Sequence, residues 1–252
     1  MSKRIVIKSS VRTVDPYDAL AAYYDAFTDD VPYKAWFDWA EAAFARAGIR
    51  PELVLDFCCG TGTLTKLFAD AGYDMIATDG SAAMLSRAQS KCRALFLCQK
   101  ADALDLYGTI DAAVCSLDAL NYLTEDVVLD EALRLVSLFM NPGGIFLADA
   151  LTPAQLPLIA DAGYVRECPE ATCVHSETCN GDRITHTVDM FLRARDGRYD
   201  RVTERHHERV YAPDDMTARF LKAGFSRVEC VAPYSFEAPP ADAPRVFYIA
   251  TK

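Results

Sequence analysis

The central part of the chain alternates between two hydrophobic patterns. Short apolar runs, typical of buried strands, are each followed by a segment with apolar residues at helical spacing. The predicted strands cover residues 53–57, 74–78, 94–98, 111–115 and 145–149. The predicted helices between them cover residues 62–71, 82–92 and a segment around 129–140. This order of elements predicts a parallel, doubly wound α/β sheet.

Two further patterns flank this region. Residues 15–48 carry aromatic side chains at helical spacing, and the segment 29–32 divides them into two predicted helices. Aromatic residues at this spacing usually belong to a core, but a segment ahead of the first strand can also close over a ligand. Beyond Tyr164, the dipeptides Asn180-Gly181 and Asp196-Gly197 are typical of hairpin turns. They separate three predicted antiparallel strands over residues 171–179, 183–194 and 199–211. A predicted helix over 215–223 and two predicted strands over 226–232 and 246–251 follow.

The most informative segment is Leu53–Gly62, where a predicted strand runs into a glycine turn and then a helix. This arrangement places a nucleotide-like ligand at a helix N-terminus, and glycine lets the ligand approach the backbone closely. Thr65 stands where the dinucleotide motif G-x-G-x-x-G has its third glycine. Asp56 would repel a pyrophosphate and is suited to an ammonium group. We therefore expect a nucleoside cofactor that carries an amino acid.

Composition and charge narrow the class of protein. The chain has 252 residues, of which 51% are hydrophobic and 25% are charged, as in an ordinary globular protein. Its net charge of -10 at pH 7 opposes binding to nucleic acid or to an anionic membrane. No apolar segment is long enough to span a bilayer, and the N-terminal stretch 1–8 has no signal-peptide pattern. The nine cysteines are an odd number scattered among apolar runs, which indicates reduced thiols and a cytoplasmic location.

A metal site is not expected. Cys168, Cys173, His175 and Cys179 lie within a short stretch, but their spacing matches no zinc-binding pattern. We expect structural or partly exposed thiols there.

Taken together, these motifs resemble those of the class I S-adenosylmethionine-dependent methyltransferases over most of residues 15–252. The segment Asp56–Gly62 is similar to the family motif D-x-[GA]-C-G-x-G, from which Cys58 departs. The segment Tyr17–Asp25, followed by Trp36, resembles the Tyr-rich N-terminal lid of small bacterial methyltransferases that also carry an antiparallel insertion. The resemblance implies a Rossmann-like, seven-stranded sheet whose last strand is antiparallel, with a small three-stranded antiparallel insertion. It also implies S-adenosyl-L-methionine as the methyl donor and S-adenosyl-L-homocysteine as the product.

The resemblance further implies a cofactor site, residue by residue. Asp56 resembles the acidic residue near the cofactor's ammonium group, and Asp79 resembles the residue that accepts hydrogen bonds from both ribose hydroxyls. Asp102 resembles the acceptor for the adenine amino group. The complete set implied for the cofactor is Tyr17, Tyr24, Tyr33, Trp36, Asp56, Cys58, Gly60, Gly62, Asp79, Gly80, Met84, Asp102, Ala103, Cys115 and Ser116. Two simpler alternatives stay open, with Asp79 as a helix cap and Asp102 as a surface loop residue.

Methyl transfer is an in-line displacement for which a protein chiefly supplies proximity and orientation. A base is needed only where the acceptor is a protonated nitrogen or a hydroxyl. The candidates are Asp118 and Tyr122 near the end of the fourth strand, and His207 and Arg209 in the insertion. His206 and His207 face opposite ways on a strand, so at most one of them points at a given pocket. The alternative for these histidines is a solvated, salt-bridged strand.

We expect three parts in the chain. They are an N-terminal helical lid over residues 1–50, a cofactor-binding core over 51–163 and 212–252, and an insertion over 164–211 that caps the substrate site. The expected function is methylation of a small-molecule acceptor by a monomer or homodimer, without membrane or nucleic-acid partners. The alternatives are a methyltransferase acting on protein or tRNA, a binding protein that senses the cofactor without catalysis, and a nicotinamide dehydrogenase. The fold alone does not separate these, since one fold supports many functions.

Overall fold

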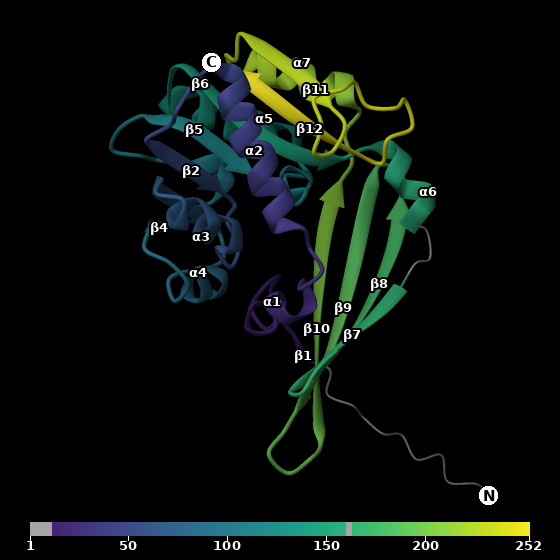
Figure 1. Ribbon diagram of the computed structural model, residues 1–252. Coiled ribbons are helices and arrows are strands. Elements are labelled where there is room, and N and C mark those ends of the chain that lie inside the picture. Colours follow the sequence, from purple (N-terminus) through teal and green to yellow (C-terminus); the bar gives the residue numbers. More distant parts are fainter. Residues whose placement is uncertain (1–11, 160–162) are drawn as a thin grey trace, which may run out of the picture.

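The computed structural model describes residues 12–159 and 163–252, which form two sheets with helices around the larger one (Figure 1). Residues 1–11 of the predicted lid, including its basic start, lie outside the described residues. Within the two described ranges, no helix is both long enough and apolar enough to cross a membrane.

The larger sheet has seven strands in the order β11-β12-β6-β5-β2-β3-β4. Their bounds are β2 Leu53–Phe57, β3 Asp74–Asp79, β4 Leu95–Cys98, β5 Ile110–Cys115, β6 Met140–Leu151, β11 Arg227–Val231 and β12 Arg245–Thr251. Strands β2 to β6 pair in parallel, whereas β12 is antiparallel to β6 and β11 is antiparallel to β12. The predicted α/β sheet with an antiparallel last strand is confirmed.

Helices cover both faces of this sheet. On one face lie α2 (Tyr33–Ala47) and α3 (Thr63–Asp70), joined to the strands through a buried aromatic cluster. On the other face lie α5 (Asp126–Phe139) and α7 (Pro213–Lys222), within the largest cluster of buried side chains. The helix α4 (Ala82–Ala88) is shorter than predicted. Burial on both faces explains why the central strands read as continuous apolar runs.

The N-terminal segment forms two short turns ahead of α2. A 3-10 turn, η1 (Leu20–Ala22), and the single turn α1 (Tyr24–Phe27) take the place of the first predicted helix. Neither has a side-chain cap, so local interactions do not extend them. Helix α2 begins after Pro32 and ends at Gly48, whose φ of 69° is the left-handed conformation that glycine favours.

The smaller sheet has five strands in the order β1-β10-β9-β8-β7, two more than predicted. Their bounds are β1 Arg12–Thr13, β7 Gly163–Cys168, β8 Ala171–Asn180, β9 Arg183–Arg193 and β10 Tyr199–Arg209. Strands β8, β9 and β10 are the three that the hairpin dipeptides predict. Both added strands lie at the edges: β1 is too short to show a period, and β7 is mostly exposed and so lacks a clear alternation.

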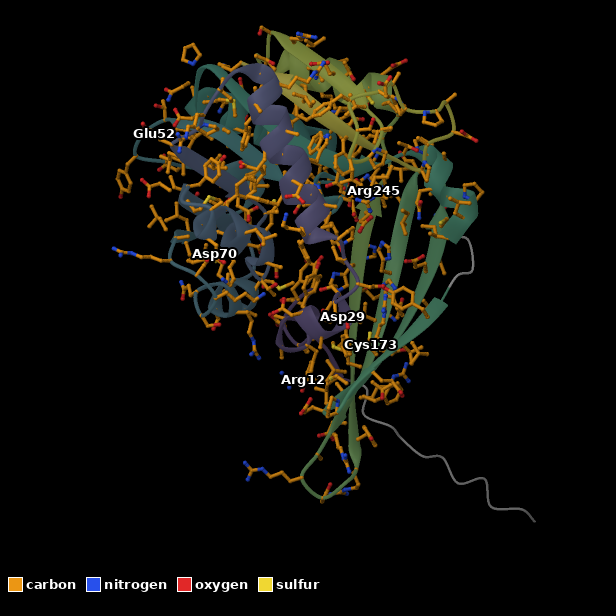
Figure 2. All side chains as sticks on the ribbon, viewed as in Figure 1. Arg12, Asp29, Glu52, Asp70, Cys173 and Arg245 are labelled. Atoms are coloured by element: carbon orange, nitrogen blue, oxygen red, sulfur yellow. The ribbon has the colours of Figure 1, made fainter. Side chains whose placement is uncertain are left out.

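The smaller sheet extends from the core as a long wall, and α1 lies against it (Figure 1). Phe27 of α1 packs there with Cys173, Val188 and Met190. A 3-10 turn, η4 (Pro153–Gln155), and α6 (Leu156–Ile159) follow β6. Arg245 at the start of β12 lies where this wall meets the core (Figure 2). The N-terminal segment therefore lies between the two sheets.

Candidate functional site

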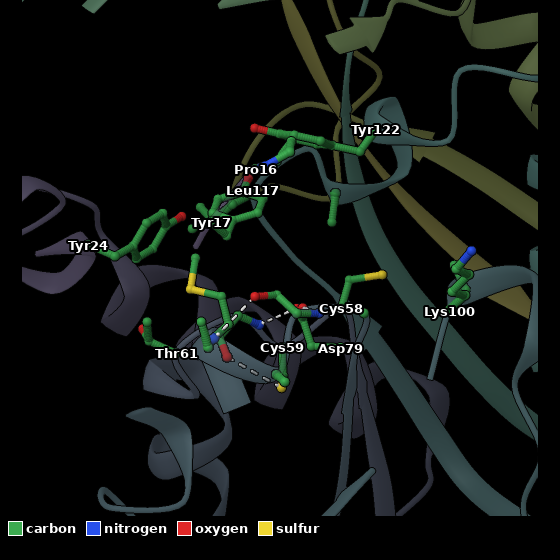
Figure 3. A pocket seen from close by; sticks show the side chains of 18 of the residues that line it. Pro16, Tyr17, Tyr24, Cys58, Cys59, Thr61, Asp79, Lys100, Leu117 and Tyr122 are labelled. Atoms are coloured by element: carbon green, nitrogen blue, oxygen red, sulfur yellow. Dashed lines mark hydrogen bonds between the residues drawn. The ribbon is translucent and has the colours of Figure 1, made fainter. Parts of the chain in front are cut away.

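A cavity of about 570 Å³, here named the first cavity, opens at the carboxyl ends of β2, β3, β4 and β5. Open parallel sheets bind their ligands in this position. Tyr17 and Tyr24 lie on one side of it, and Cys58, Thr61 and Asp79 lie on the other (Figure 3). The residues of the predicted cofactor set that line it are Tyr17, Tyr24, Tyr33, Cys58, Gly60, Asp79, Gly80, Met84, Asp102 and Ser116.

The two glycines of the turn after β2 serve different purposes. Gly60 has φ 55° and lines the first cavity, and no other heavy atom lies within 4 Å of where its Cβ would stand. A Cβ on Gly62 would lie only 2.8 Å from the Cβ of Ala88, so Gly62 allows α3 and α4 to pack closely. Cys58, where the family has Gly or Ala, adopts φ 62°, which is costly for a residue with a side chain. The turn is therefore retained despite this departure.

Asp79 lies at the rim of the first cavity with its carboxylate held by two backbone amides. Gly60 N donates to Oδ2 at 2.9 Å, and Ser81 N donates to Oδ1 at 2.7 Å. Burial raises the pKa of this carboxyl. The helix cap itself is supplied by Ser81, whose hydroxyl accepts from Met84 N. Asp79 is therefore positioned by the turn and still faces the cavity.

Several residues of the predicted cofactor set do not line the cavity: Trp36, Asp56, Gly62, Ala103 and Cys115. Trp36 lies in the core, where its Nε1 donates to Asp149 at 2.9 Å. Asp56 is 1% exposed and accepts a hydrogen bond from Thr65 at 2.5 Å, and burial raises its pKa to about 7. Cys115 is fully buried. The side chains of Trp36, Asp56 and Cys115 thus lie in the core behind the cavity, and the assignment of all five residues to the cofactor stays a prediction.

The N-terminal tyrosines are held by a residue that the sequence analysis missed. Glu204 of β10 is completely buried, and its carboxylate accepts hydrogen bonds from the backbone amides of Tyr17 (2.8 Å), Ala19 (2.7 Å) and Leu20 (3.0 Å). His206 lies 3.1 Å from the same carboxylate. This anchor fixes Tyr17 at φ 65°, with its ring 4.6 Å from that of His206. The available signal was the alternation of β10, which places Glu204 on the same face as Val202 and His206.

A cavity of about 350 Å³, the second cavity, adjoins the first and shares Tyr17, Tyr24, Leu117 and Tyr122 with it. It lies between the N-terminal segment, the loop after β5 and the inner face of the smaller sheet. Apolar residues form part of its wall: Leu20, Phe27, Val31, Leu151, Ile159 and Val188. Polar residues form the rest: Asp118, Gln155, Arg166, His175, Glu177, His186, His206, Glu208 and Arg245, with Thr28, Tyr164 and Cys173 beside them.

Two of the four predicted catalytic residues, Asp118 and Tyr122, line this second cavity. Arg245 Nη2 donates to Asp118 Oδ1 at 2.5 Å, and the amides of Leu117 and Asp118 donate to Asp149 at 2.7 and 3.1 Å. Burial raises the pKa of Tyr122 well above that of a free phenol. Tyr122 is therefore a neutral hydrogen-bonding group at neutral pH.

The other two, His207 and Arg209, line neither cavity. His207 is exposed and pairs with Thr185 at 3.1 Å. Arg209 binds Asp182 at 2.7 Å and Asp126 at 2.8 Å. These two residues lie on the face of β10 that points away from both cavities, and their catalytic role stays a prediction. The alternation of the strand instead turns His206 and its neighbours at even positions inward.

The inner face of the smaller sheet carries a group of charged side chains that the sequence analysis did not assemble. His186 Nδ1 lies 3.1 Å from Glu177 Oε1, and His186 Nε2 lies 3.3 Å from Glu208 Oε1. Burial opposes charge on His186, but the two carboxylates outweigh it and raise its pKa to about 9. Burial and the nearby His186 lower the pKa of His175 to about 4. The available signal was His175 and Glu177 two positions apart on β8, and Glu204, His206 and Glu208 at every second position of β10.

Comparisons with known proteins agree with this geometry. Residues 54–144 match the family described as "Methyltransferase domain". An S-adenosylmethionine-dependent methyltransferase from Clostridium acetobutylicum ATCC 824 superposes with a TM-score of 0.82 at 25% identity, over 93% of this chain and 98% of that one. Together these matches support a class I S-adenosylmethionine-dependent methyltransferase. A putative methyltransferase of Geobacillus sp. (strain WCH70) is 27% identical over 94% of this methyltransferase and 99% of its own length. A demethylmenaquinone methyltransferase of Beutenbergia cavernae is 31% identical over 59% of this chain and 62% of its own length.

The cofactor of this methyltransferase is S-adenosyl-L-methionine. A neighbouring fold, the amino pentose methyltransferase CalS10 from Micromonospora echinaspora, has S-adenosylmethionine bound; it is 19% identical, with a TM-score of 0.69 over 89% of this chain and 97% of that one. The first cavity fits such a ligand, because it combines an open glycine backbone at Gly60, a carboxylate at Asp79 and an apolar side chain at Met84.

Proposed function

We propose that this methyltransferase transfers the methyl group to a small molecule held in the second cavity. The observation that carries the proposal is the wall common to both cavities, formed by Tyr17, Tyr24, Leu117 and Tyr122. A donor on one side of these residues and an acceptor on the other would lie within reach of each other, as an in-line displacement requires.

In this proposal the core holds the cofactor. We assign the ribose hydroxyls to the carboxylate of Asp79, because the turn amides already orient its oxygens. The adenine and methionyl parts are assigned to the remaining lining residues, namely Cys58, Gly60, Gly80, Met84, Asp102 and Ser116. When bound, the cofactor supplies a methyl group activated by positively charged sulfur.

The N-terminal segment is proposed to act as a lid and the smaller sheet as a cap. Tyr17, Tyr24 and Tyr33 would exclude water and present aromatic faces to the cationic sulfur. Burial raises the pKa of Tyr17 and of Tyr122, so both phenols stay protonated. They can therefore orient an acceptor by hydrogen bonding but do not act as bases at neutral pH.

The second cavity favours a small acceptor with one apolar and one polar side. Its volume of about 350 Å³ is in the range typical of small-ligand pockets. The relatives and neighbours include methyltransferases named for demethylmenaquinone and for an amino pentose, neither of which is a macromolecule. A tRNA acceptor is less consistent with a net charge of -10.

The proposal is tested by filling the second cavity. Gln155 lines it, whereas Leu158, a turn away in α6, is 64% exposed and does not. After an acceptor has been found by screening quinols, amino sugars and carboxylic acids with labelled methyl donor, Gln155→Trp should lower turnover at least about tenfold, which corresponds to about 1.4 kcal/mol of transition-state stabilisation. Leu158→Trp is the matched control.

Both variants should bind S-adenosyl-L-homocysteine like the unmodified protein in calorimetric titration, because the first cavity is unchanged. Normal turnover in Gln155→Trp would place the acceptor elsewhere. Cofactor binding without transfer to any acceptor class would favour a cofactor sensor instead.

A further inference from the structure

Two histidines and a glutamate meet on the inner face of the smaller sheet. His175 and Glu177 stand two residues apart on β8 and so share a face. His186 of β9 is the cross-strand partner of Glu177. One possible ligand atom from each residue lies within 4.8 Å of the other two. All three residues line the second cavity.

We propose that His175, Glu177 and His186 bind a divalent transition-metal ion of the zinc type at the wall of the second cavity. Two imidazoles and one carboxylate are a donor set that suits zinc. Bonds of about 2.1 Å in a tetrahedron hold ligand atoms about 3.4 Å apart. Glu177 Oε1 lies 3.1 Å from His186 Nδ1 and 3.6 Å from His175 Nδ1, on either side of that spacing.

The hydrogen bonding of His175 is incomplete in a way that a metal ion would correct. Its Nδ1 is buried and has no hydrogen-bond partner among the residues described. The ring is fixed between Tyr164, at 4.5 Å, and the parallel ring of His186, at 5.3 Å. A buried polar atom without a partner costs free energy. Glu177 Oε1 pairs with His186 Nδ1 at 3.1 Å but lies 3.6 Å from His175 Nδ1, whereas a metal ion between the three residues would satisfy both of these nitrogens.

Behind the proposed ligands, Glu208 provides the support that metal-binding histidines usually have. Its side chain is 3% exposed, and Oε1 lies 3.3 Å from His186 Nε2, the nitrogen opposite the proposed ligand atom. A carboxylate in this position selects the tautomer and orients the ring. This contact and the unpaired His175 nitrogen are independent observations.

Three protein ligands leave a tetrahedral ion with one open position. Because the ligands line the second cavity, that position is available to an oxygen or nitrogen atom of an acceptor. This consequence rests on the proposed function, whereas metal binding itself does not.

The test is a titration of the metal-free, full-length protein with Co²⁺, followed by visible absorption. We expect one Co²⁺ per chain, with ligand-field bands of a tetrahedral site. The bands of thiolate-to-cobalt charge transfer should be absent, because the proposed ligands are nitrogen and oxygen, although the chain has nine cysteines. Glu177→Gln keeps the shape of the side chain but removes its charge, and it should weaken binding at least about tenfold.

His175→Ala should weaken Co²⁺ binding to a similar extent, so the test does not depend on one variant folding. His207→Ala is the matched control, because His207 is an exposed histidine on the other face of the same sheet. It should bind Co²⁺ like the unmodified protein. In all three variants, circular dichroism and affinity for S-adenosyl-L-homocysteine should stay unchanged.

Absence of a stoichiometric site, thiolate charge-transfer bands that reveal binding at cysteines only, or unchanged affinity in folded Glu177→Gln would each overturn the proposal. The titration needs no acceptor and no turnover. If no cobalt site is found, the proposed methyl transfer is unaffected. If the transfer assay fails but cobalt binds as expected, the metal site stands and the proposed function is overturned.

Discussion

Asp79 and Asp56, the two aspartates beside the first cavity, differ in how deeply they are buried. Asp79 follows β3 and keeps its carboxylate at the rim, where backbone amides orient it. Asp56 lies one strand inward and is 1% exposed, with Thr65 as its hydrogen-bond donor. The two residues have the same side chain, but of the two only Asp79 lines the first cavity.

The burial of Asp56 predicts a pH dependence of stability. Its folded-state pKa of about 7 lies above the value of about 3.9 for an aspartate in an unfolded chain. Between these values the folded state binds more protons than the unfolded state. The contribution of Asp56 to stability is therefore complete below about pH 4 and is lost as the pH rises towards about 7. The full loss is at most about 4 kcal/mol, at about 1.4 kcal/mol for each pKa unit.

Asp56→Asn removes this titration while keeping an oxygen that can accept from Thr65. In urea denaturation of the ligand-free protein, we expect the free energy of unfolding of the variant to rise relative to that of the unmodified protein between about pH 4 and pH 8. Parallel pH profiles for the two proteins would contradict this.

The N-terminal segment, the proposed lid, is held in place by a strand far away in sequence. Its turns are too short to be stable by themselves, and Glu204 receives three of their backbone amides. The position of Tyr17 in the first cavity therefore depends on β10.

Glu204→Gln should release this segment. Glutamine has one accepting oxygen, so its amide group must face at least one of the backbone donors. Losing charge-assisted hydrogen bonds of about 1.5–3 kcal/mol should speed hydrogen exchange at Tyr17, Ala19 and Leu20 by at least about tenfold. The measurement is hydrogen exchange by mass spectrometry.

Glu208→Gln is the control for the lid, because Glu208 is equally buried on the same face of β10 but holds no lid amide. It should leave exchange at these amides unchanged. Equal protection in the two variants would mean that packing, and not Glu204, holds the lid.

Across the whole molecule, one buried carboxylate connects three parts of the chain. Asp149 of β6 accepts from Trp36 of α2 and from the amides of Leu117 and Asp118 after β5, and it pairs with Arg245 of β12. This network lies between the core and the second cavity, so it joins the fold to the proposed acceptor site.

Asp149→Ala should lower the free energy of unfolding by about 2–4 kcal/mol, because it leaves the buried indole N–H of Trp36 and the Nη1 group of Arg245 without their acceptor, while Arg245 Nη2 keeps Asp118. Asp149→Asn retains one acceptor and should lose less. Urea denaturation measures both. A loss below about 0.5 kcal/mol in Asp149→Ala would show that the network adds no net stability.

The local signals predicted the elements of the core well. Apolar runs, helical periods and glycine turns each depend on neighbouring residues, so β2, β3 and α3 follow from the sequence. Strand β1 and the 3-10 turn η1 could not be predicted, since both depend on contacts with β10. The resemblance to the family placed Asp79 and Ser116 at the cavity, but it also placed Trp36 there, which the fold uses as a core residue.

The amino-acid pattern was enough to predict an α/β sheet with an antiparallel insertion, because hydrophobic period and turn chemistry act over short distances along the chain. The methyltransferase class came from the resemblance of the glycine-turn motif and the Tyr-rich segment to a known family. Tertiary structure alone decided which face of β10 turns inward. Alternation places His206 and His207 on opposite faces of the strand, but it does not tell which face is buried. Packing against the N-terminal segment makes the face that carries His206 the interior one. The grouping of His175, Glu177 and His186 likewise needs the pairing of β8 with β9, a register that no local pattern contains.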